Sequence, residues 1–123
     1  MVICVPVTPE GTVDGGFGRA PRVAVFRVED GRVVAADVHD VRWDELHDAG
    51  PEGSHHARIA RFLIDNGVEG VAAGHVGPPM QHTMARMGVR VWLGAAGDAR
   101  AVAIAAAAQV AESADAPGPR PSA

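Results

Sequence analysis

The stretch Val71-Ala72-Ala73-Gly74-His75-Val76-Gly77-Pro78 is the part of the sequence that decides the fold. Residues 70–74 form a short apolar run, which is typical of a buried strand. Pro78-Pro79 follows almost at once and favours the start of a helix, because the fixed φ of proline suits the first helical turn. A strand that leads straight into a helix is the repeating unit of parallel sheets. The stretch therefore predicts an α/β domain.

Helical and strand patterns continue on both sides of this unit. Ser54 is the predicted N-cap of an amphipathic helix whose apolar stripe includes His56, and Gly67 is its predicted stop. Asp98 is the predicted cap of a final, alanine-rich helix. The predicted elements of this half are helices over 54–66, 78–87 and 99–111 and strands over 70–74 and 89–93. A helix between two strands predicts a parallel crossover.

The amino-terminal half adds strands that pair in the opposite direction. A glycine-rich loop, Gly11 to Gly18, follows the first apolar run. Asp30-Gly31 separates two β-branched runs and predicts a two-residue hairpin. The polar segment that leads to Gly53 contains Trp43 but few other large apolar residues, so we expect a long surface connection there. The predicted strands of this half are 1–7, 23–28 and 33–41.

Together these elements predict a three-layer α/β/α domain with a mixed sheet of about five strands. A length of 123 residues and a hydrophobic fraction of 47% suit one domain with one core. We assign this domain to residues 1–112. Residues 113–123 contain three prolines and are predicted to be a disordered tail.

Charge and cysteine content narrow the classes of function. The formal net charge is −4, lysine is absent and the 11 arginines are scattered, which disfavours nucleic acid as a partner. Cys4 is the single cysteine, so one chain cannot ligate an iron–sulfur cluster through four thiolates. The sequence has no apolar run of membrane-spanning length and no basic leader at its start. We therefore expect a cytoplasmic protein without a membrane partner.

Ligand sites in open α/β sheets lie beyond the carboxyl ends of the parallel strands. The loop Gly74-His75-Val76-Gly77 lies at such an end and precedes a predicted helix, whose N-terminal dipole favours an anion. His75 can present a ring nitrogen to a ligand or metal there. The alternatives are that Gly74 and Gly77 only permit a tight turn and that His75 is a solvated loop residue.

Two further segments are expected to meet this loop. His55 and His56 lie at the start of a predicted helix, where the dipole favours neutral, metal-ligating imidazole. Their alternative is a solvated pair, with His56 as a possible core residue. In the first loop, Phe17, Gly18 and Arg19 offer an aromatic ring, free backbone and a bidentate donor. Phe17 could instead anchor the loop in the core, and Arg19 could pair with a surface acid.

Four segments follow one another in a characteristic order: Val2-Ile3-Cys4-Val5-Pro6-Val7, Phe17-Gly18-Arg19-Ala20-Pro21, the stretch 71–78 quoted above, and Gly88-Val89-Arg90-Val91-Trp92-Leu93-Gly94-Ala95. In this combination they resemble the dinitrogenase iron–molybdenum cofactor biosynthesis family. The resemblance implies a ribonuclease-H-like α/β/α fold and a role as a nitrogen-fixation accessory. It also implies that the iron–molybdenum cofactor or another iron–sulfur cluster is bound and passed between donor and acceptor proteins.

The sequence departs from the family pattern at two positions. Gly16 stands where family members often carry a histidine or another polar residue, and His75 stands where they more often carry a small one. We expect the cluster-facing role to have moved to His75.

Non-catalytic carriage of an iron-containing cluster is the predicted function. A nuclease of the ribonuclease-H type needs several carboxylates for its metal ions, one typically on the first strand, and residues 1–7 contain no acid. The alternative is a regulatory domain that binds a small molecule or nucleotide at the Gly74 to Pro78 helix start. These expectations assign Phe17, Gly18, Arg19, Gly74, His75 and Gly77 to cofactor binding and His75, His55 and His56 to the metal.

Overall fold

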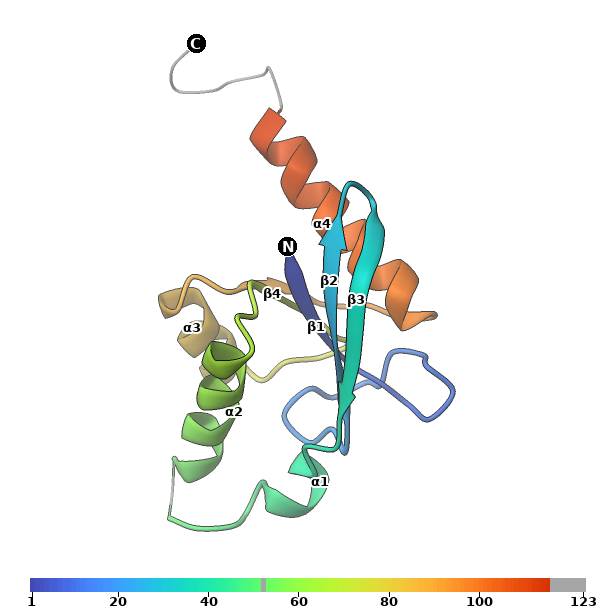
Figure 1. The fold of residues 1–123 in the computed structure, drawn as a ribbon. Helices are drawn as coiled ribbons and strands as arrows, with labels where there is room; N and C mark the ends of the chain where they lie inside the picture. The colour runs from blue at the N-terminus through green and yellow to red at the C-terminus, as the bar shows by residue number, and fades with distance from the viewer. Residues whose placement is uncertain (52, 116–123) are drawn as a thin grey trace.

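The computed structural model describes residues 1–51 and 53–115 (Figure 1). Five strands and four helices follow one another along the chain in these described ranges. The strands are β1 (Val2–Pro6), β2 (Val23–Glu29), β3 (Arg32–His39), β4 (Gly70–Ala72) and β5 (Arg90–Trp92). The helices are α1 (Trp43–Leu46), α2 (Ser54–Asp65), α3 (Pro78–Arg86) and α4 (Ala99–Asp115).

The five strands form one mixed sheet in the order β3-β2-β1-β4-β5. β1 pairs antiparallel with β2, and Cys4 lies opposite Val25. β1 pairs in parallel with β4 on its other side, and β4 in turn pairs in parallel with β5. The predicted α/β fold with a mixed sheet of about five strands is therefore confirmed. β1 and β4 end at the same edge of the sheet, so the loops that follow them leave the sheet side by side.

Helices cover both faces of this sheet and make the expected three layers. α2 and α3 lie on one face, where Ile59, Leu63 and Met84 are buried around Cys4. α4 lies on the other face, where its alanines pack against Ile3 and the remaining buried residues of β1 and β2 (Figure 1). Small side chains on α4 permit this close approach of helix and sheet. Cys4 is wholly buried, which agrees with its assignment as a small core residue, and burial raises the pKa of its thiol.

Three local predictions were wrong at the level of single residues. The connection from β3 to α2 contains the short helix α1, and its Trp43 is 1% exposed, so this segment is not simply a surface connection. The N-cap of α2 is Gly53, so Ser54 is the first residue of the helix. His56 is exposed and contributes nothing to the core, because the apolar stripe of α2 begins at Ile59.

The last helix begins as predicted and extends further. Asp98 Oδ2 accepts a hydrogen bond of 2.8 Å from the backbone N–H of Ala101, as an N-cap does. α4 continues to Asp115, so it includes the first three residues of the segment predicted as a tail. The rest of that predicted tail, residues 116–123, lies outside the described residues. None of the helices in the described part is long and apolar enough to cross a membrane.

We expect Gly31→Val to lower the free energy of unfolding by about 1 kcal/mol or more, because it strains the turn of the β2–β3 hairpin. Asp30 and Gly31 have φ of 51° and 78°, as a primed two-residue turn requires, and a β-branched residue tolerates such angles poorly. Urea denaturation measures the change. Gly16→Ala is the control, since Gly16 has no positive φ and a Cβ there meets nothing within 4 Å. Equal stability of the Gly31 variant and the parent would contradict the turn assignment.

Candidate functional site

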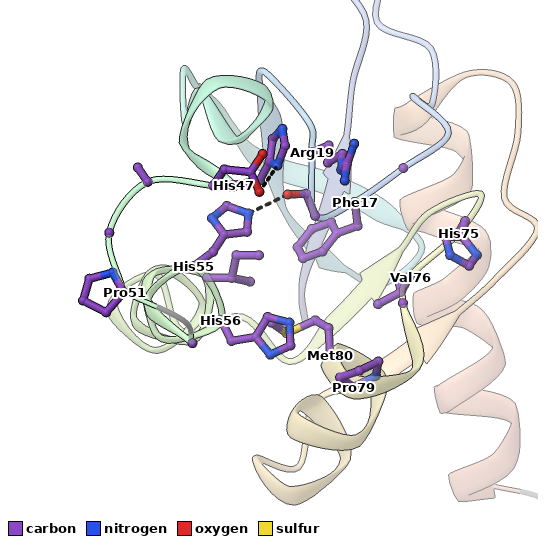
Figure 2. A pocket seen from close by; sticks show the side chains of 18 residues that line it. Phe17, Arg19, His47, Pro51, His55, His56, His75, Val76, Pro79 and Met80 are labelled. Carbon is purple, nitrogen blue, oxygen red and sulfur yellow. Dashed lines mark hydrogen bonds and ion pairs between the residues drawn. The ribbon is translucent and has the colours of Figure 1, made fainter.

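An open pocket of about 830 Å³ lies at the edge of the sheet where β1 and β4 end (Figure 2). Four segments line it, and they come from the loop after β1, the connection after α1, the first half of α2 and the loop that leads into α3. The lining residues fall within 16–19, 47–51, 53–59 and 75–80. The three segments predicted to converge do so in this pocket, and the connection after α1 joins them.

Backbone hydrogen bonds hold the two strand-end loops together. The His75 N–H donates to the Gly15 carbonyl at 2.7 Å, and the Phe17 N–H donates to the His75 carbonyl at 3.0 Å. Gly16 and His75 thereby form a parallel bridge that continues the pairing of β1 with β4. The absence of a side chain at Gly74 makes this approach possible, since a Cβ there would lie 2.9 Å from the Gly15 oxygen. Gly74 therefore has a structural role at the base of the pocket.

The other glycines of the pocket have a different role. Gly18 and Gly77 lack positive φ, and a Cβ at Gly18 would meet nothing within 4 Å. At Gly77 the nearest atom to such a Cβ is Pro79 Cδ at 4.0 Å. Both positions could carry a side chain without backbone strain. Glycine at these positions leaves space in the pocket and exposes backbone N–H groups.

The start of α3 offers fewer free backbone N–H donors than the sequence predicted. Pro78 and Pro79 are the first two residues of α3, and neither has a backbone N–H. The first amide of the helix that is hydrogen-bonded is that of Gln81, which donates to the Gly77 carbonyl. Only the Met80 N–H remains as a free donor in the first turn, so the predicted anion site at this helix end is weaker than expected.

Phe17 anchors the first loop in the core below the pocket. It is wholly buried, and its ring packs edge-on against Trp43 with 5.2 Å between the ring centroids. Trp43 in turn packs edge-on against Phe62 of α2 at 5.6 Å. This aromatic cluster, Phe17, Trp43 and Phe62, joins the first loop, α1 and α2. Phe17 therefore supports the pocket from beneath, while the neighbouring Gly18 and Arg19 face outward.

His55, together with Arg58, links α2 to the first loop and to the end of α1 through hydrogen bonds. Its Nδ1 lies 2.9 Å from Arg58 Nη1, and the same guanidinium nitrogen donates to the Leu46 carbonyl at 3.1 Å. Since a guanidinium only donates, His55 Nδ1 accepts and Nε2 carries the proton. Nε2 then donates to the Gly18 carbonyl at 2.6 Å (Figure 2). Both ring nitrogens of His55 are therefore engaged, and neither is free to bind a metal.

Exposed polar side chains surround the mouth of the pocket. Arg19, His56 and His75 are exposed and form no ion pair within the described residues. His47 Nδ1 lies 3.2 Å from Asp48 Oδ1. Figure 2 shows His56 near Met80 on one side, whereas His75 lies at the opposite end of the pocket. The two exposed imidazoles thus come from different segments and are not adjacent.

Side chains alone do not form a complete metal site in the described part of the chain. No three His, Cys, Asp or Glu side chains are grouped there so that they could hold a metal ion. Cys4 is buried in the same core cluster as Phe17 and does not line the pocket. A metal-containing ligand in this pocket therefore needs to bring most of its own coordinating atoms.

Sequence reasoning did not identify every residue that shapes the pocket. Arg58, which orders His55, and His47 with Asp48 were given no role. One signal pointed to Arg58, because it lies three residues after His55 and residues at this spacing are neighbours on a helix. No comparable pattern predicts that His47 and Asp48 turn toward the pocket.

Comparison with known proteins identifies the family of this chain. The family model described as dinitrogenase iron-molybdenum cofactor matches residues 1–109. The chain belongs to this family. No relative is found among curated protein sequences.

Solved structures with low sequence identity to this chain share its fold. The apo form of the orange protein from Desulfovibrio gigas has a TM-score of 0.68 and 21% identity, over 89% of this chain and 88% of that protein. A candidate NifB protein from Thermotoga has a TM-score of 0.62 and 23% identity, over 88% and 87%. A candidate dinitrogenase from Methanocaldococcus jannaschii has a TM-score of 0.60 and 13% identity, over 86% and 89%.

We expect Gly74→Ala and Gly77→Ala to separate the two roles of glycine in this pocket. Gly74→Ala should destabilise the fold by about 1–3 kcal/mol, because the new methyl group overlaps the Gly15 backbone. Gly77→Ala should change stability by less than about 0.5 kcal/mol, because its backbone suits any residue before a proline. Thermal and urea denaturation of both variants measure the difference. Equal losses would contradict the close approach of the two loops.

We expect His55→Ala to destabilise the fold by about 1–3 kcal/mol, because it leaves the Gly18 carbonyl without its donor and removes one of the two acceptors of Arg58 Nη1. His56→Ala is the matched control on the adjacent residue. It should change stability by less than about 0.5 kcal/mol, since His56 is exposed. Thermal denaturation compares the two variants. A silent His55 variant would contradict the bridging role.

Proposed function

We propose that this chain binds a preformed, anionic metal–sulfur cluster in the pocket and carries it, without catalysing a reaction on it. The observation that carries the proposal is the convergence on one open pocket of the first loop, the start of α2 and the loop into α3. Membership of the dinitrogenase iron-molybdenum cofactor family supports an iron- and molybdenum-containing cargo. The cargo would arrive from a donor protein and leave to an acceptor protein.

The charges at the pocket favour an anion that is held weakly. Arg19 and Asp48 are the fully charged side chains among the described lining residues. Asp48 lies beside His47, whereas Arg19 has no ion-pair partner in the described part of the chain. A guanidinium offers several N–H donors to sulfide or oxygen atoms of a cluster. Backbone N–H groups at Gly18 and Gly77 add neutral donors, because neither donates to a protein acceptor in the described residues.

Coordination in this proposal is limited to a single imidazole. His75 is the first candidate, since it is exposed at the end of the β4 loop and its backbone is fixed by two hydrogen bonds. His56 is the second candidate, on the opposite side of the pocket. Neutral imidazole is a suitable ligand for iron. His55 is not included, because its ring nitrogens are already hydrogen-bonded.

The nucleotide-binding alternative has less support from the geometry. A phosphate site at a helix start relies on several free backbone N–H groups. Pro78 and Pro79 remove two of them from α3. The regulatory hypothesis therefore loses two of the backbone N–H donors on which it was based.

We expect His75→Ala to weaken binding of isolated iron–molybdenum cofactor by tenfold or more, which corresponds to about 1.4 kcal/mol. Arg19→Gln should weaken it as well, because it removes the free positive charge at the pocket. Anaerobic titration of untagged protein, followed by analysis of bound iron and molybdenum, measures the affinity. ATP is titrated in parallel as a probe of the nucleotide alternative.

His82→Ala and Arg86→Gln are the matched controls, because both side chains are exposed on α3 outside the pocket. Neither should change the affinity. A parent protein that binds no cluster, or variants at positions 19 and 75 that both bind it like the parent, would refute the proposed site.

A further inference from the structure

The edge strand β3 carries an unusual concentration of exposed apolar side chains. Within the described residues β3 is paired with β2 on one side only and forms one edge of the sheet (Figure 1). Val34 is 50% exposed and Val38 is 65% exposed. The other large hydrophobic residues that are this exposed in the described part, Ile64 and Leu93, lie singly on other elements. The free edge of β3 is therefore a candidate interaction surface.

The exposed valines lie on one face of the sheet. Val38 is opposite Ala24, and Ala36 is opposite Phe26, which places both on the face covered by α4. The pairing with β2 skips one residue after Val33, so Val34 is the extra residue of a β-bulge. Because side chains alternate from there onward, Val34 lies on the same face as Ala36 and Val38. These three residues form a short apolar row, Val34, Ala36 and Val38.

The row is symmetric about Ala36, and this symmetry indicates the partner. We propose that the free edge of β3 pairs antiparallel with β3 of a second copy of this chain, about a two-fold axis that passes beside Ala36. In this register Val34 of each copy lies opposite Val38 of the other, and the two Ala36 residues lie opposite each other. Directly opposed β-branched residues stabilise antiparallel pairs. The four exposed valines then cover one another.

The charges at the ends of β3 agree with an antiparallel arrangement. Arg32 begins the strand, and Asp40 follows its end with a side chain that is 78% exposed. Antiparallel pairing brings the start of one copy beside the end of the other, so Arg32 approaches Asp40 of the second copy. Parallel pairing would instead bring like charges together. A self-complementary surface of this kind is what a two-fold symmetric dimer requires.

The edge lacks two of the features that prevent such pairing, since β3 contains neither lysine nor proline. It keeps two others, the bulge at Val34 and the charged Asp37. An interface built on about five residues of each copy is smaller than a standard stable interface. We therefore expect a weak dimer, with a dissociation constant in the range of about 10 μM to 1 mM.

Sedimentation equilibrium across this concentration range tests the association. We expect the parent chain to shift from monomer to dimer and Val38→Lys to weaken dimerisation by at least tenfold, because each ammonium group then lies opposite Val34 of the other copy and interrupts the apolar row. Ile64→Lys is the matched control, since Ile64 is 64% exposed on α2, and it should dimerise like the parent. A parent that stays monomeric throughout, or equal effects of both variants, would overturn the proposal.

Disulfide cross-linking tests the register. Opposed residues of an antiparallel pair have Cα atoms about 4.5–5.5 Å apart, which a disulfide can span. Ala36→Cys should therefore form a cross-linked dimer under mild oxidation, whereas Ala35→Cys should not, because the two copies of residue 35 are offset along the strands. Cys4 does not interfere, since it is fully buried. Efficient cross-linking at position 35 and none at 36 would overturn the proposed axis.

Discussion

Two hydrogen bonds between the segments around Gly15 and His75 are the constraint on which the pocket depends. β1 and β4 are parallel neighbours, so the loops that follow them leave from one edge of the sheet. The bonds from the His75 N–H to the Gly15 carbonyl and from the Phe17 N–H to the His75 carbonyl continue that pairing beyond the strands. They require two backbones to approach more closely than a side chain at Gly74 would permit. Phe17 is thereby directed into the core, and Gly18 and Arg19 are left at the surface.

Two kinds of interaction attach α1 and α2 to these two loops: aromatic packing and side-chain hydrogen bonds. Beneath the pocket, Trp43 packs between Phe17 and Phe62, so apolar burial fixes α1 and α2 against the first loop. Above it, the His55 and Arg58 side chains connect the carbonyls of Gly18 and Leu46. A half-buried polar network of this kind is stabilising only when every member has its partner. The side chains that give the pocket its shape are therefore largely distinct from those free to contact a ligand.

The sequence predicted the elements, the mixed sheet and the meeting of three loops, because these follow from apolar periodicity and from the rule that parallel strands end together. It did not predict the burial of Trp43, since one aromatic residue in a polar segment has no periodic partners. Nor could it distinguish His55 from His56. The two are adjacent and chemically identical, and only the three-dimensional positions of Arg58 and Gly18 assign one to structure and leave the other exposed.

Under the proposed function, the small number of available ligands suits carriage rather than permanent storage. A cluster held by several thiolates is released slowly, because several strong bonds have to break. A cluster held by one imidazole, one guanidinium and a few backbone N–H groups loses only one coordinate bond when it leaves. The hydrogen bonds of His55 and the backbone bridge between Gly16 and His75 do not involve such a ligand, so they persist after release. The pocket then keeps its shape for the next cargo, and little ordering entropy opposes each round of binding.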